Sequence, residues 1–517
     1  MCSKGVTAVW ACALVLGCAL RAVALTAARP YFSYVDEGNF LHPPLGLVRD
    51  GGWDPKEYLY PQFPTLVVTA AARGLEAAVR ADGGSSLRDR IPRKVEVYDE
   101  FEPFAFLLLA RCLSLVAGVA VLFLTGLLAG RVAGKAAGAA AALLAALAPA
   151  LTLRASIASV DAYATLAVLG CVYLTDRTRD AARPGVVSFG AGLCAGAAFA
   201  SKYPAVLVLL AFGVTTVLAP IGWGARARRL AAAGAGALLG AAAAMPALLT
   251  HLREVLEALR IQHYWYARMA TEQPLWRQAF VEAESTLHYP HPEVSVGFAA
   301  LALIGVVVGL RDRRIAPTVA GWCAFAASSF LLYGSQVFHP FRNLLPLVPL
   351  GCVAAALAFA WIRGRVGQPA WVDAAAAVWL VATLGVPLAG QVRARHDLED
   401  SRKLAVDWLA ANAQPGDEVV FVRDLGFLEQ EIQRVPSKHS RPWWVEAGAL
   451  IPSRKPRFVV SGVLSQMDGS ALDTQASPAL ADYQPRFRAG KKPTMPVPGW
   501  WRGNDELVIV FERKTDG

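Results

Sequence analysis

The sequence predicts an α-helical polytopic membrane protein with about eleven transmembrane helices and a small C-terminal α/β domain. The first observation is the composition: of 517 residues, 55% are hydrophobic and 17% are charged, whereas soluble domains average about 25% charged residues. The second is a series of long apolar runs that stops near residue 390. The third is that many Lys and Arg residues form short clusters between these runs. Such clusters are typical of membrane topology signals and do not form a nucleic-acid-binding stripe, so the net charge of +10 predicts no nucleic-acid partner.

An apolar stretch crosses the hydrocarbon core of a bilayer as a helix when it has about 20 residues. Stretches of this kind lie at residues 6–28, 103–130, 136–153, 160–176, 186–201, 204–221, 230–250, 294–310, 316–333, 341–362 and 371–390. Several of them are rich in Ala and Gly, which lets helix backbones approach closely in lipid. The eight cysteines lie in or beside apolar segments, so we expect neither a disulfide framework nor a cysteine zinc site.

The clusters of cations fall in alternate short loops, and such clusters mark the cytoplasmic side. They are Arg131 with Lys135; Arg177, Arg179 and Arg183; Arg226, Arg228 and Arg229; Arg311, Arg313 and Arg314; and Arg363 with Arg365. We therefore expect the loops 29–102 and 251–293, and the chain from residue 391, on the extracytoplasmic side. Reading the first apolar run as a signal peptide leaves loop 29–102 on the same side. The Ala- and Arg-rich composition suits the inner membrane of a GC-rich bacterium.

The chain changes character after residue 390, and we expect two domains, 1–390 in the membrane and 391–517 outside it. SRKLAVDWLAANAQPGDEVVFV predicts an amphipathic helix, a Pro-Gly turn and a strand. KPRFVVSGV and DELVIVFER predict further strands. The C-terminal segment is therefore expected to be a small α/β domain.

Ionisable residues recur at the expected outer ends of the spans. An acid or a base there is often only a solvated loop residue, or a long side chain that reaches the interface. A carboxylate at a membrane boundary is costly, however, unless it faces a cavity or a partner. Taken together, these residues predict an outward-facing polar site: Asp36 and Glu37 in VDEGNF, Asp161 in SIASVDAYATLAV, Lys202 in AFASKYPAVL, and His339 with Arg342 in QVFHPFRNLLPLVPL.

These motifs, in this order, resemble the GT-C superfamily of membrane glycosyltransferases, in the broad group that includes the protein O-mannosyltransferases and the aminoarabinose transferases of lipid A. The resemblance covers most of the chain. It rests on Arg21 within the first span, VDEGNF, LLLARCLSLVAGVAVLFLTGLLAG, APALTLRASIASVDAYATLAVLGCVYL, GAAFASKYPAVLVLL and HPFRNLLPLVPLGCVAAALA. The stretch HPPLGLVRDGGWDP departs from it and leaves the subfamily open.

The resemblance implies an enzyme that moves a sugar from a polyprenyl-phosphate donor to an acceptor on the non-cytoplasmic face. Such a transfer needs a base for the acceptor hydroxyl, and a carboxylate in a partly desolvated cavity can serve. By position in the motif, Asp36 is the first candidate and Glu37 the second. Asp161 matches the second acidic position, where it would orient the acceptor or the base, or hold a metal.

The leaving phosphate needs cations. Lys202 and Arg342 match positions suited to that role, and His339 would add a hydrogen bond. Weaker candidates are Arg21, Arg111 and Arg154.

Two further features bear on ligands. LYPQFPTLVVTAAARGLEAAV at residues 59–79 predicts an amphipathic helix on the membrane surface, with Tyr58 and Tyr60 as interfacial aromatics or sugar contacts. No resident cofactor is firmly implied. A divalent cation between Asp36 and Asp161 is a weaker option. Zinc on His288 and His291 is another, and Pro290 breaks any helix that would align these two histidines.

Two other functions fit an integral membrane protein. A transporter or flippase of lipid-linked intermediates predicts mid-membrane charges and two related halves, which the sequence does not display. An inactive GT-C-like scaffold would not need Asp36, Asp161 and Lys202. The sugar stays open, and so does the acceptor, which is a lipid, a protein or a polysaccharide.

Overall fold

The computed structural model describes residues 3–23, 25, 35–81, 104–268, 274, 276–277, 280, 296–334, 341–367, 370–397, 400–422, 427, 429–442, 444–465, 471–473, 478–489 and 507–514. The chain divides into two compact units. The first comprises Met1–Leu25, Asp50–Arg73 and Leu109–Arg393. The second comprises Thr26–Arg49, Gly74–Leu108 and Ala394–Gly517.

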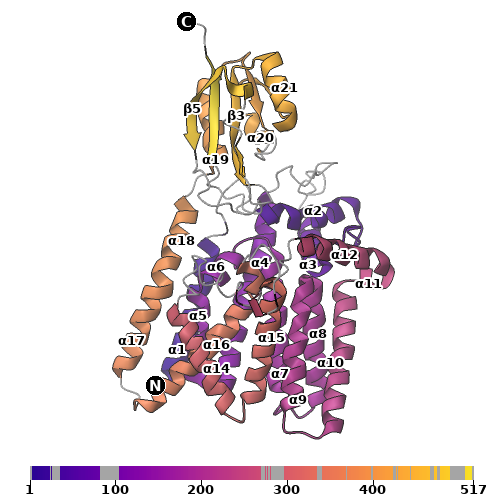
Figure 1. The fold of residues 1–517 in the computed structure, drawn as a ribbon, viewed down its shortest axis with the longest axis vertical. Coiled ribbons are helices and arrows are strands. Elements are labelled where there is room, and N and C mark those ends of the chain that lie inside the picture. Colours follow the sequence, from indigo (N-terminus) through magenta and orange to yellow (C-terminus); the bar gives the residue numbers. More distant parts are fainter. Residues whose placement is uncertain are drawn as a thin grey trace. The chain divides into compact units, whose positions relative to one another are not determined.

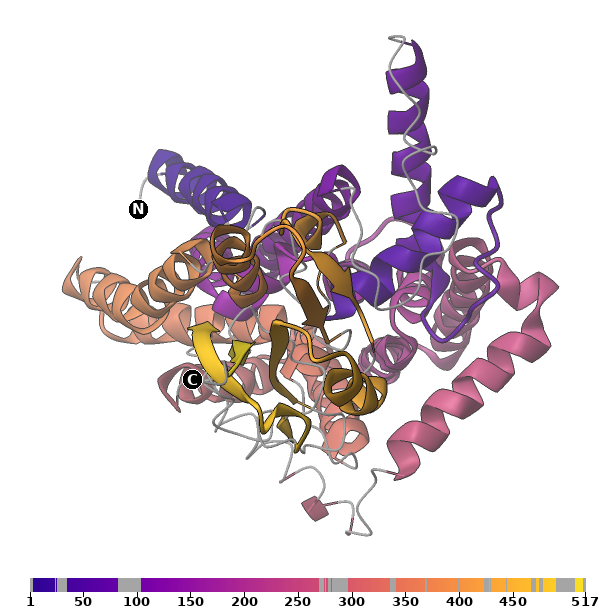
Figure 2. The same ribbon diagram turned by 90° about the horizontal axis from the view of Figure 1, so that it is seen from above.

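The first unit is a helical bundle whose long helices run side by side (Figure 1). Figure 2 shows α12 lying across the direction of these helices. The helices wholly or mainly in this unit are α1 (Ser3–Val23), α3 (Gln62–Ala81), α4 (Phe104–Ala133), α5 (Lys135–Leu147), α6 (Pro149–Ala155), α7 (Val160–Arg177), α8 (Pro184–Ser201), η3 (Tyr203–Leu207), α9 (Val208–Leu218), α10 (Trp223–Ala244), α11 (Ala247–Thr250), α12 (Leu252–Arg268), α14 (Val296–Arg311), α15 (Ala316–Gly334), η5 (Phe341–Leu344), α16 (Leu347–Arg365), α17 (Ala370–Leu380), the π-helical turn Val381–Gly385 and α18 (Val386–Asp397).

Every stretch that the sequence predicts to span the membrane contains a helix. By length and composition, four helices among the described residues can cross a bilayer, namely α4, α8, α15 and α16. The count is five if α5 and α6, which meet at a bend of 62°, form one broken span. The protein is therefore a multi-pass membrane protein, while the expected number of about eleven spans is not confirmed.

Small residues let α8 and α10 touch through their backbones. Gly192 and Gly196 on α8 face the backbone of α10 around Ala237. Gly236 and Gly240 on α10 face the backbone of α8 around Leu193. In each helix the two glycines are four residues apart. A Cβ atom at Gly236 would lie 2.1 Å from the carbonyl oxygen of Phe189. No side chain fits at that distance, so these glycines set the separation of the two helices.

A second buried carboxylate, Asp176, lies near the C-terminal end of α7, whereas Asp161 lies in its first turn. Asp176 is fully buried, and its Oδ2 accepts from Arg131 Nε at 2.9 Å. Its Oδ1 lies 2.6 Å from Arg179 Nη2 and accepts from Thr318 Oγ1 at 3.2 Å. The three partners tie α4 and α15 to α7, because a buried charge without partners would be strongly destabilising.

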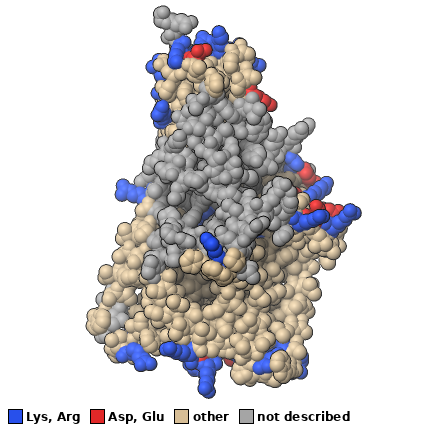
Figure 3. Space-filling view, in the orientation of Figure 1, with Lys and Arg blue, Asp and Glu red and all other residues tan. Residues whose placement is uncertain are grey.

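Lys and Arg residues gather at this same end of the bundle. Figure 3 shows them below a broad band of uncharged surface. Exposed members of the group, which we call the basic end, are Arg177, Arg228, Arg311, Arg313 and Arg365. The uncharged band fits the hydrocarbon region of a bilayer, and the cations fit its headgroup layer.

The second unit contains a six-stranded mixed sheet with the order β2-β1-β3-β6-β5 and β4 paired to β3. The strands are β1 (Glu418–Phe421), β2 (Lys438–Ser440), β3 (Phe458–Ser465), β4 (Ala471–Asp473), β5 (Tyr483–Ala489) and β6 (Leu507–Arg513), and the helices are α19 (Ser401–Asn412), α20 (Glu429–Ile432) and α21 (Trp444–Arg454). Strand β1 runs parallel to both neighbours, with Val420 opposite Val459. The core includes Leu409, Phe421 and Phe458. The C-terminal part of the chain therefore has the α/β character that the sequence predicts, while the domain boundary at residue 390 stays a prediction.

Helix α2 (Val35–Asp50) falls in the range 29–102 that the sequence predicts as an outer loop with interfacial helices. The acidic pair and the stretch after it are helical as far as Asp50, and the outer position of this range stays a prediction. The helix contains Pro43 and Pro44. Proline removes backbone donors but fixes φ near the helical value, so the pattern that suggests a loop is compatible with a helix here. The helix expected within residues 59–79 is confirmed as α3, and its place on the membrane surface stays a prediction.

Replacing Gly236 by Val should destabilise the bundle, because the new side chain meets the backbone of α8. We expect a loss of about 1–3 kcal/mol in the free energy of unfolding. The measurement is thermal unfolding in detergent. Gly234→Val on the same helix is the matched control, since a Cβ at Gly234 has nothing within 4 Å. Equal melting temperatures for the two variants would contradict the close contact.

Candidate functional site

The core of the candidate site is an ion pair between α7 and the end of α8. Lys202 Nζ lies 2.8 Å from Asp161 Oδ1. The Asp161 side chain is 4% exposed and the Lys202 side chain 18% exposed. The structure thus brings together two of the residues that the sequence singles out, and it leaves the lysine open on one side.

Local backbone geometry explains how each side chain reaches the other. Asp161 stands in the first turn of α7, which Val160 begins. Lys202 is the C-cap of α8, with extended φ and ψ angles of −158° and 111°. Its N–H donates to Ala198 O at 2.9 Å, and its carbonyl accepts from Ala205 N at 2.8 Å. The turn between α8 and η3 is therefore held at both sides of Lys202.

The two side chains of the pair stabilise each other. In a medium of low dielectric, each charge is stabilised mainly by the other. A lysine ammonium carries three N–H donors, and the contact with Asp161 uses one. An incoming anion can therefore bind the exposed side of Lys202 while Asp161 still orients the ammonium group.

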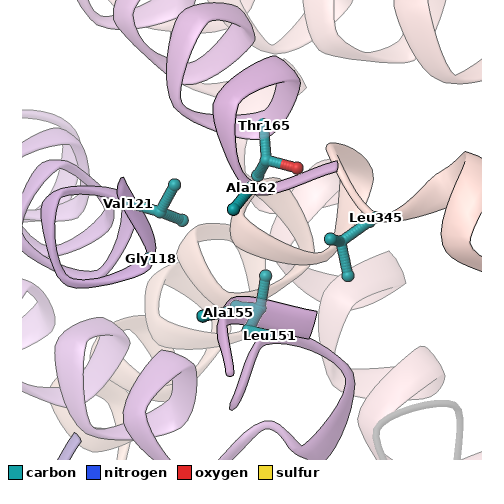
Figure 4. A pocket seen from close by; sticks show the side chains of 7 residues that line it. All are labelled: Gly118, Val121, Leu151, Ala155, Ala162, Thr165 and Leu345. Atoms are coloured by element: carbon teal, nitrogen blue, oxygen red, sulfur yellow. The ribbon is translucent and has the colours of Figure 1, made fainter. Parts of the chain in front are cut away.

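An apolar pocket borders the first turns of α7, the helix that carries Asp161 (Figure 4). Its lining residues come from α4, α6, α7 and the turn after η5, and they are Gly118, Val121, Leu151, Ala155, Ala162, Thr165 and Leu345. Thr165 Oγ1 donates to the carbonyl oxygen of Asp161 at 2.8 Å. The elements that carry Arg154, Asp161 and Arg342 therefore meet around one pocket.

Arg342 lies in η5 and is half-buried. Leu345 N donates to its carbonyl oxygen at 3.3 Å, which links Arg342 to the wall of the pocket. Arg154 stands in the last turn of α6 and is also half-buried. Both arginines belong to the same unit as Lys202.

Arg21 and Arg111 are fully buried and donate to backbone carbonyl groups. Arg21 Nη1 bonds Gly17 O at 2.8 Å, and Arg21 Nη2 bonds Ala145 O at 3.2 Å. Arg111 Nη1 bonds Leu25 O at 2.7 Å, just beyond the end of α1. Cations at the C-terminal ends of helices are stabilised by the helix dipole.

The acidic pair lies in the second unit, whereas Asp161 and Lys202 lie in the first. Glu37 is fully buried in α2. Asp36 belongs to the same helix, and its side chain falls outside the described residues. The catalytic roles of the two acids stay predictions.

The predicted histidines, His288, His291 and His339, lie outside the described residues. Within the described part of the chain, no group of three or more His, Cys, Asp and Glu side chains is arranged to hold a metal ion. A cation shared by Asp36 and Asp161 stays a prediction, because the side chain of Asp36 lies outside the described residues.

Tyr58 joins a cluster that the sequence does not reveal. Its hydroxyl donates to Asp54 Oδ1 at 2.8 Å, its ring stacks on His251, and its carbonyl accepts from Tyr203 Oη at 2.7 Å. Burial, and then the hydrogen bond to Asp54, raise the pKa of the Tyr58 phenol above its ordinary value. Tyr203 follows Lys202 directly, and this adjacency is the signal that could have linked the first loop to the site.

Tyr60 is half-buried in the same segment. Gln62 Oε1 accepts from Ala247 N at 3.2 Å, and Gln262 Nε2 donates to Leu59 O. The stretch from Tyr58 to Gln62 is thus fastened to α11 and α12. These contacts give Tyr58 and Tyr60 a packing role, and a sugar contact stays a prediction.

Replacing Lys202 by Met should destabilise the protein because Asp161 would then be buried without its cation. Removing one partner of a buried pair costs about 3–5 kcal/mol in the free energy of unfolding. Adding Asp161→Asn to Lys202→Met should restore part of this loss, since the amide is neutral. Thermal unfolding of the four proteins in the cycle measures the coupling.

Lys135→Met provides the matched control, because Lys135 is an exposed lysine of the same unit at the start of α5. We expect its melting temperature to equal that of the wild type. Strictly additive effects of Lys202→Met and Asp161→Asn would show that the two side chains do not depend on each other.

No protein-family model and no curated protein matches the sequence. Among solved structures, the chain is similar to ArnT from Cupriavidus metallidurans bound to undecaprenyl phosphate, with 14% identity, a TM-score of 0.55, and coverage of 99% of this chain and 98% of that chain. It is also similar to the apo oligosaccharyltransferase of Archaeoglobus fulgidus, with 12% identity, a TM-score of 0.52, and coverage of 89% of this chain and 70% of that chain.

A second structure of that archaeal enzyme, AglB in complex with an inhibitory peptide and a dolichol-phosphate, gives 11% identity and a TM-score of 0.51, and the match covers 88% of this chain and 69% of that chain. At these identities, the likeness concerns the fold. The chain has the GT-C fold, which confirms at that level the resemblance that the sequence motifs indicate.

Proposed function

We propose that this protein is an integral-membrane glycosyltransferase that moves a sugar from a polyprenyl-phosphate donor to an acceptor on the non-cytoplasmic face. The observation that carries the proposal is the buried, one-sided ion pair of Lys202 and Asp161 at the end of the bundle opposite the basic end. The GT-C fold supports it, because the similar ArnT structure holds undecaprenyl phosphate and the similar AglB structure holds a dolichol-phosphate.

The charge change of the reaction explains why a fixed lysine belongs at this site. A sugar phosphodiester carries one negative charge, and the polyprenyl phosphate that leaves carries up to two. A cation held beside the phosphate therefore binds the developing product more strongly than the donor, which lowers the barrier to transfer. Lys202 supplies this cation, and Arg342 is the second candidate.

Asp161 has a supporting role in this scheme. Its contact with Lys202 at 2.8 Å orients the ammonium group before the donor binds. A preoriented charge needs little rearrangement during the reaction, which is where much of its catalytic value lies. The lipid chain of the donor would pass along the apolar surface of the bundle, and the phosphate would stop at the charged end.

The remaining step is proton transfer. The acceptor hydroxyl attacks the anomeric carbon, the bond from that carbon to the phosphate oxygen breaks, and the polyprenyl phosphate leaves with the bonding electrons. A carboxylate takes the hydroxyl proton. Asp36 is our first candidate for this base and Glu37 the second, while Asp161 is committed to Lys202.

Native mass spectrometry in mild detergent should find a bound polyprenyl-phosphate sugar when the protein is mixed with a panel of such donors. Lys202→Gln and Arg342→Gln should weaken this binding, because each removes a cation from the phosphate. Lys135→Gln, at the opposite end of the bundle, should bind as the wild type does. If no donor binds the wild type, or if all three variants bind equally well, the phosphate assignment is wrong.

Asp36→Asn should retain donor binding and lose turnover by roughly 10²–10⁴-fold, the usual range for a general base. The comparison is with Glu37→Gln, measured with the same donor. A larger loss in Glu37→Gln would transfer the role of the base to Glu37. Full turnover in both variants would remove the acidic pair from the mechanism. No turnover in the wild type with any donor of the panel would favour a scaffold or a transporter.

A further inference from the structure

The break between α5 and α6 leaves carbonyl groups without their usual helical donors. In a continuous helix, the N–H of residue 149 would donate to Ala145 O. Residue 149 is proline and has no N–H, and Ala148 adopts extended angles of −66° and 111°. One neighbouring carbonyl, Ala146 O, accepts from Thr152 Oγ1 at 3.1 Å.

Arg21 supplies the donor that Pro149 lacks. Its Nη2 reaches from α1 to Ala145 O at 3.2 Å, while its Nη1 returns to Gly17 O at 2.8 Å in its own helix. The side chain is fully buried. An orphaned carbonyl within the bilayer costs several kcal/mol, so this long-range bond compensates for the break.

The bundle makes room for the guanidinium group with two glycines. A Cβ at Gly17 would lie 3.1 Å from Arg21 Nη1 and 2.4 Å from a methyl group of Leu122. A Cβ at Gly118 would lie 3.4 Å from Arg21 Nε and 2.3 Å from the Cβ of Ala155. The space next to Gly17 and Gly118, which we call the Arg21 niche, therefore brings α1, α4 and α6 together around one charged group.

The positive charge of Arg21 lies at the C-terminal end of α5, where it is stabilised. Within the described part of the chain, Arg21 forms no ion pair with a carboxylate. Its bond to Ala145 O lies in the last turn of α5, where the helix dipole presents partial negative charge to a cation. The arginine and the broken helix therefore stabilise each other.

We propose that Arg21 is a positioning residue that holds the bend of 62° between α5 and α6 and thereby places Asp161. Helix α6 ends at Ala155, and α7 begins five residues later at Val160, directly before Asp161. Ala155 also packs against Gly118 next to Arg21, and it lines the same pocket as Ala162, the residue after Asp161. A shift of α6 must therefore move the start of α7 and weaken the contact of Asp161 with Lys202.

This role differs from phosphate binding, for which Arg21 is a candidate on sequence grounds. Its effect on turnover rests on the proposed function, whereas its effect on structure does not. The two are therefore measured separately.

The structural part is tested by a double-mutant cycle of Arg21→Met and Pro149→Ala. Arg21→Met should lower the melting temperature, because Ala145 O loses its donor. Adding Pro149→Ala should recover much of this loss, since the new N–H can bond Ala145 O. Pro184→Ala is the matched control, because Pro184 stands at the start of α8, where no carbonyl within the helix needs its N–H; it should not rescue Arg21→Met.

The positioning part is tested by the reactivity of Lys202 towards a small acylating reagent, followed by mass spectrometry of the peptide that contains it. Lys202 should react faster in Arg21→Met than in the wild type, because Asp161 has moved away. In Arg21→Met with Pro149→Ala, Ala145 O regains a donor but the bend straightens, so the fast reaction should persist. Turnover with the donor should fall by about 100-fold in both, since a displacement of 1 Å is enough for such a loss.

Additive melting-temperature shifts in the cycle would overturn the proposal, and so would unchanged Lys202 reactivity in Arg21→Met. If Arg21→Met does not fold, Arg21→Lys replaces it in the same cycle, because lysine keeps the charge but reaches fewer carbonyls. A wild type without transferase activity would refute the proposed function alone. The melting temperatures and the Lys202 reactivity would still decide the role of Arg21.

Discussion

Helix α7 carries a buried carboxylate near each end, and the arrangement of its neighbours depends on how these two charges are neutralised. Asp161 is paired with Lys202 at 2.8 Å, and Asp176 is paired with Arg131 and Arg179. A charge in a medium of low dielectric needs a close partner. The end of α8 and the end of α4 must therefore approach α7 at opposite sides of the membrane region.

The helices near Asp161 and Lys202 are interrupted, and neighbouring protein groups satisfy the backbone at the interruptions. The helix pair α5 and α6 is broken at Pro149, and α8 stops at Lys202 before the short helix η3. Non-helical backbone within a membrane survives only where protein groups satisfy its polar atoms. Arg21 and Thr152 do so at the first break, and Ala205 N does so for the carbonyl oxygen of Lys202. Gly17 on α1 and Gly118 on α4 give the Arg21 side chain its space.

The sequence alone predicts those parts of the fold that local patterns encode. Hydropathy locates the helices, and strand β6 stands out because its apolar residues are consecutive and buried. Strand β2 is missed because it has only three residues, and strand β5 is missed because exposed arginines and a proline interrupt its apolar residues. Helix α2 does not stand out individually, because Pro43 and Pro44 interrupt its helical pattern. The candidate site is predicted in part: Asp161 and Lys202 stand out as costly charges, but their pairing depends on which helices touch, as does the burial of Asp176.

The most direct measurement is an experimental structure of the protein with a polyprenyl phosphate bound. The account predicts a phosphate oxygen within hydrogen-bonding distance of Lys202 Nζ, roughly 2.7–3.2 Å, with Asp161 still in contact with the same ammonium group. It also predicts the lipid chain against the uncharged band of the bundle. A phosphate bound elsewhere, with the pair of Lys202 and Asp161 closed to it, would contradict the central claim that this ion pair receives the leaving group.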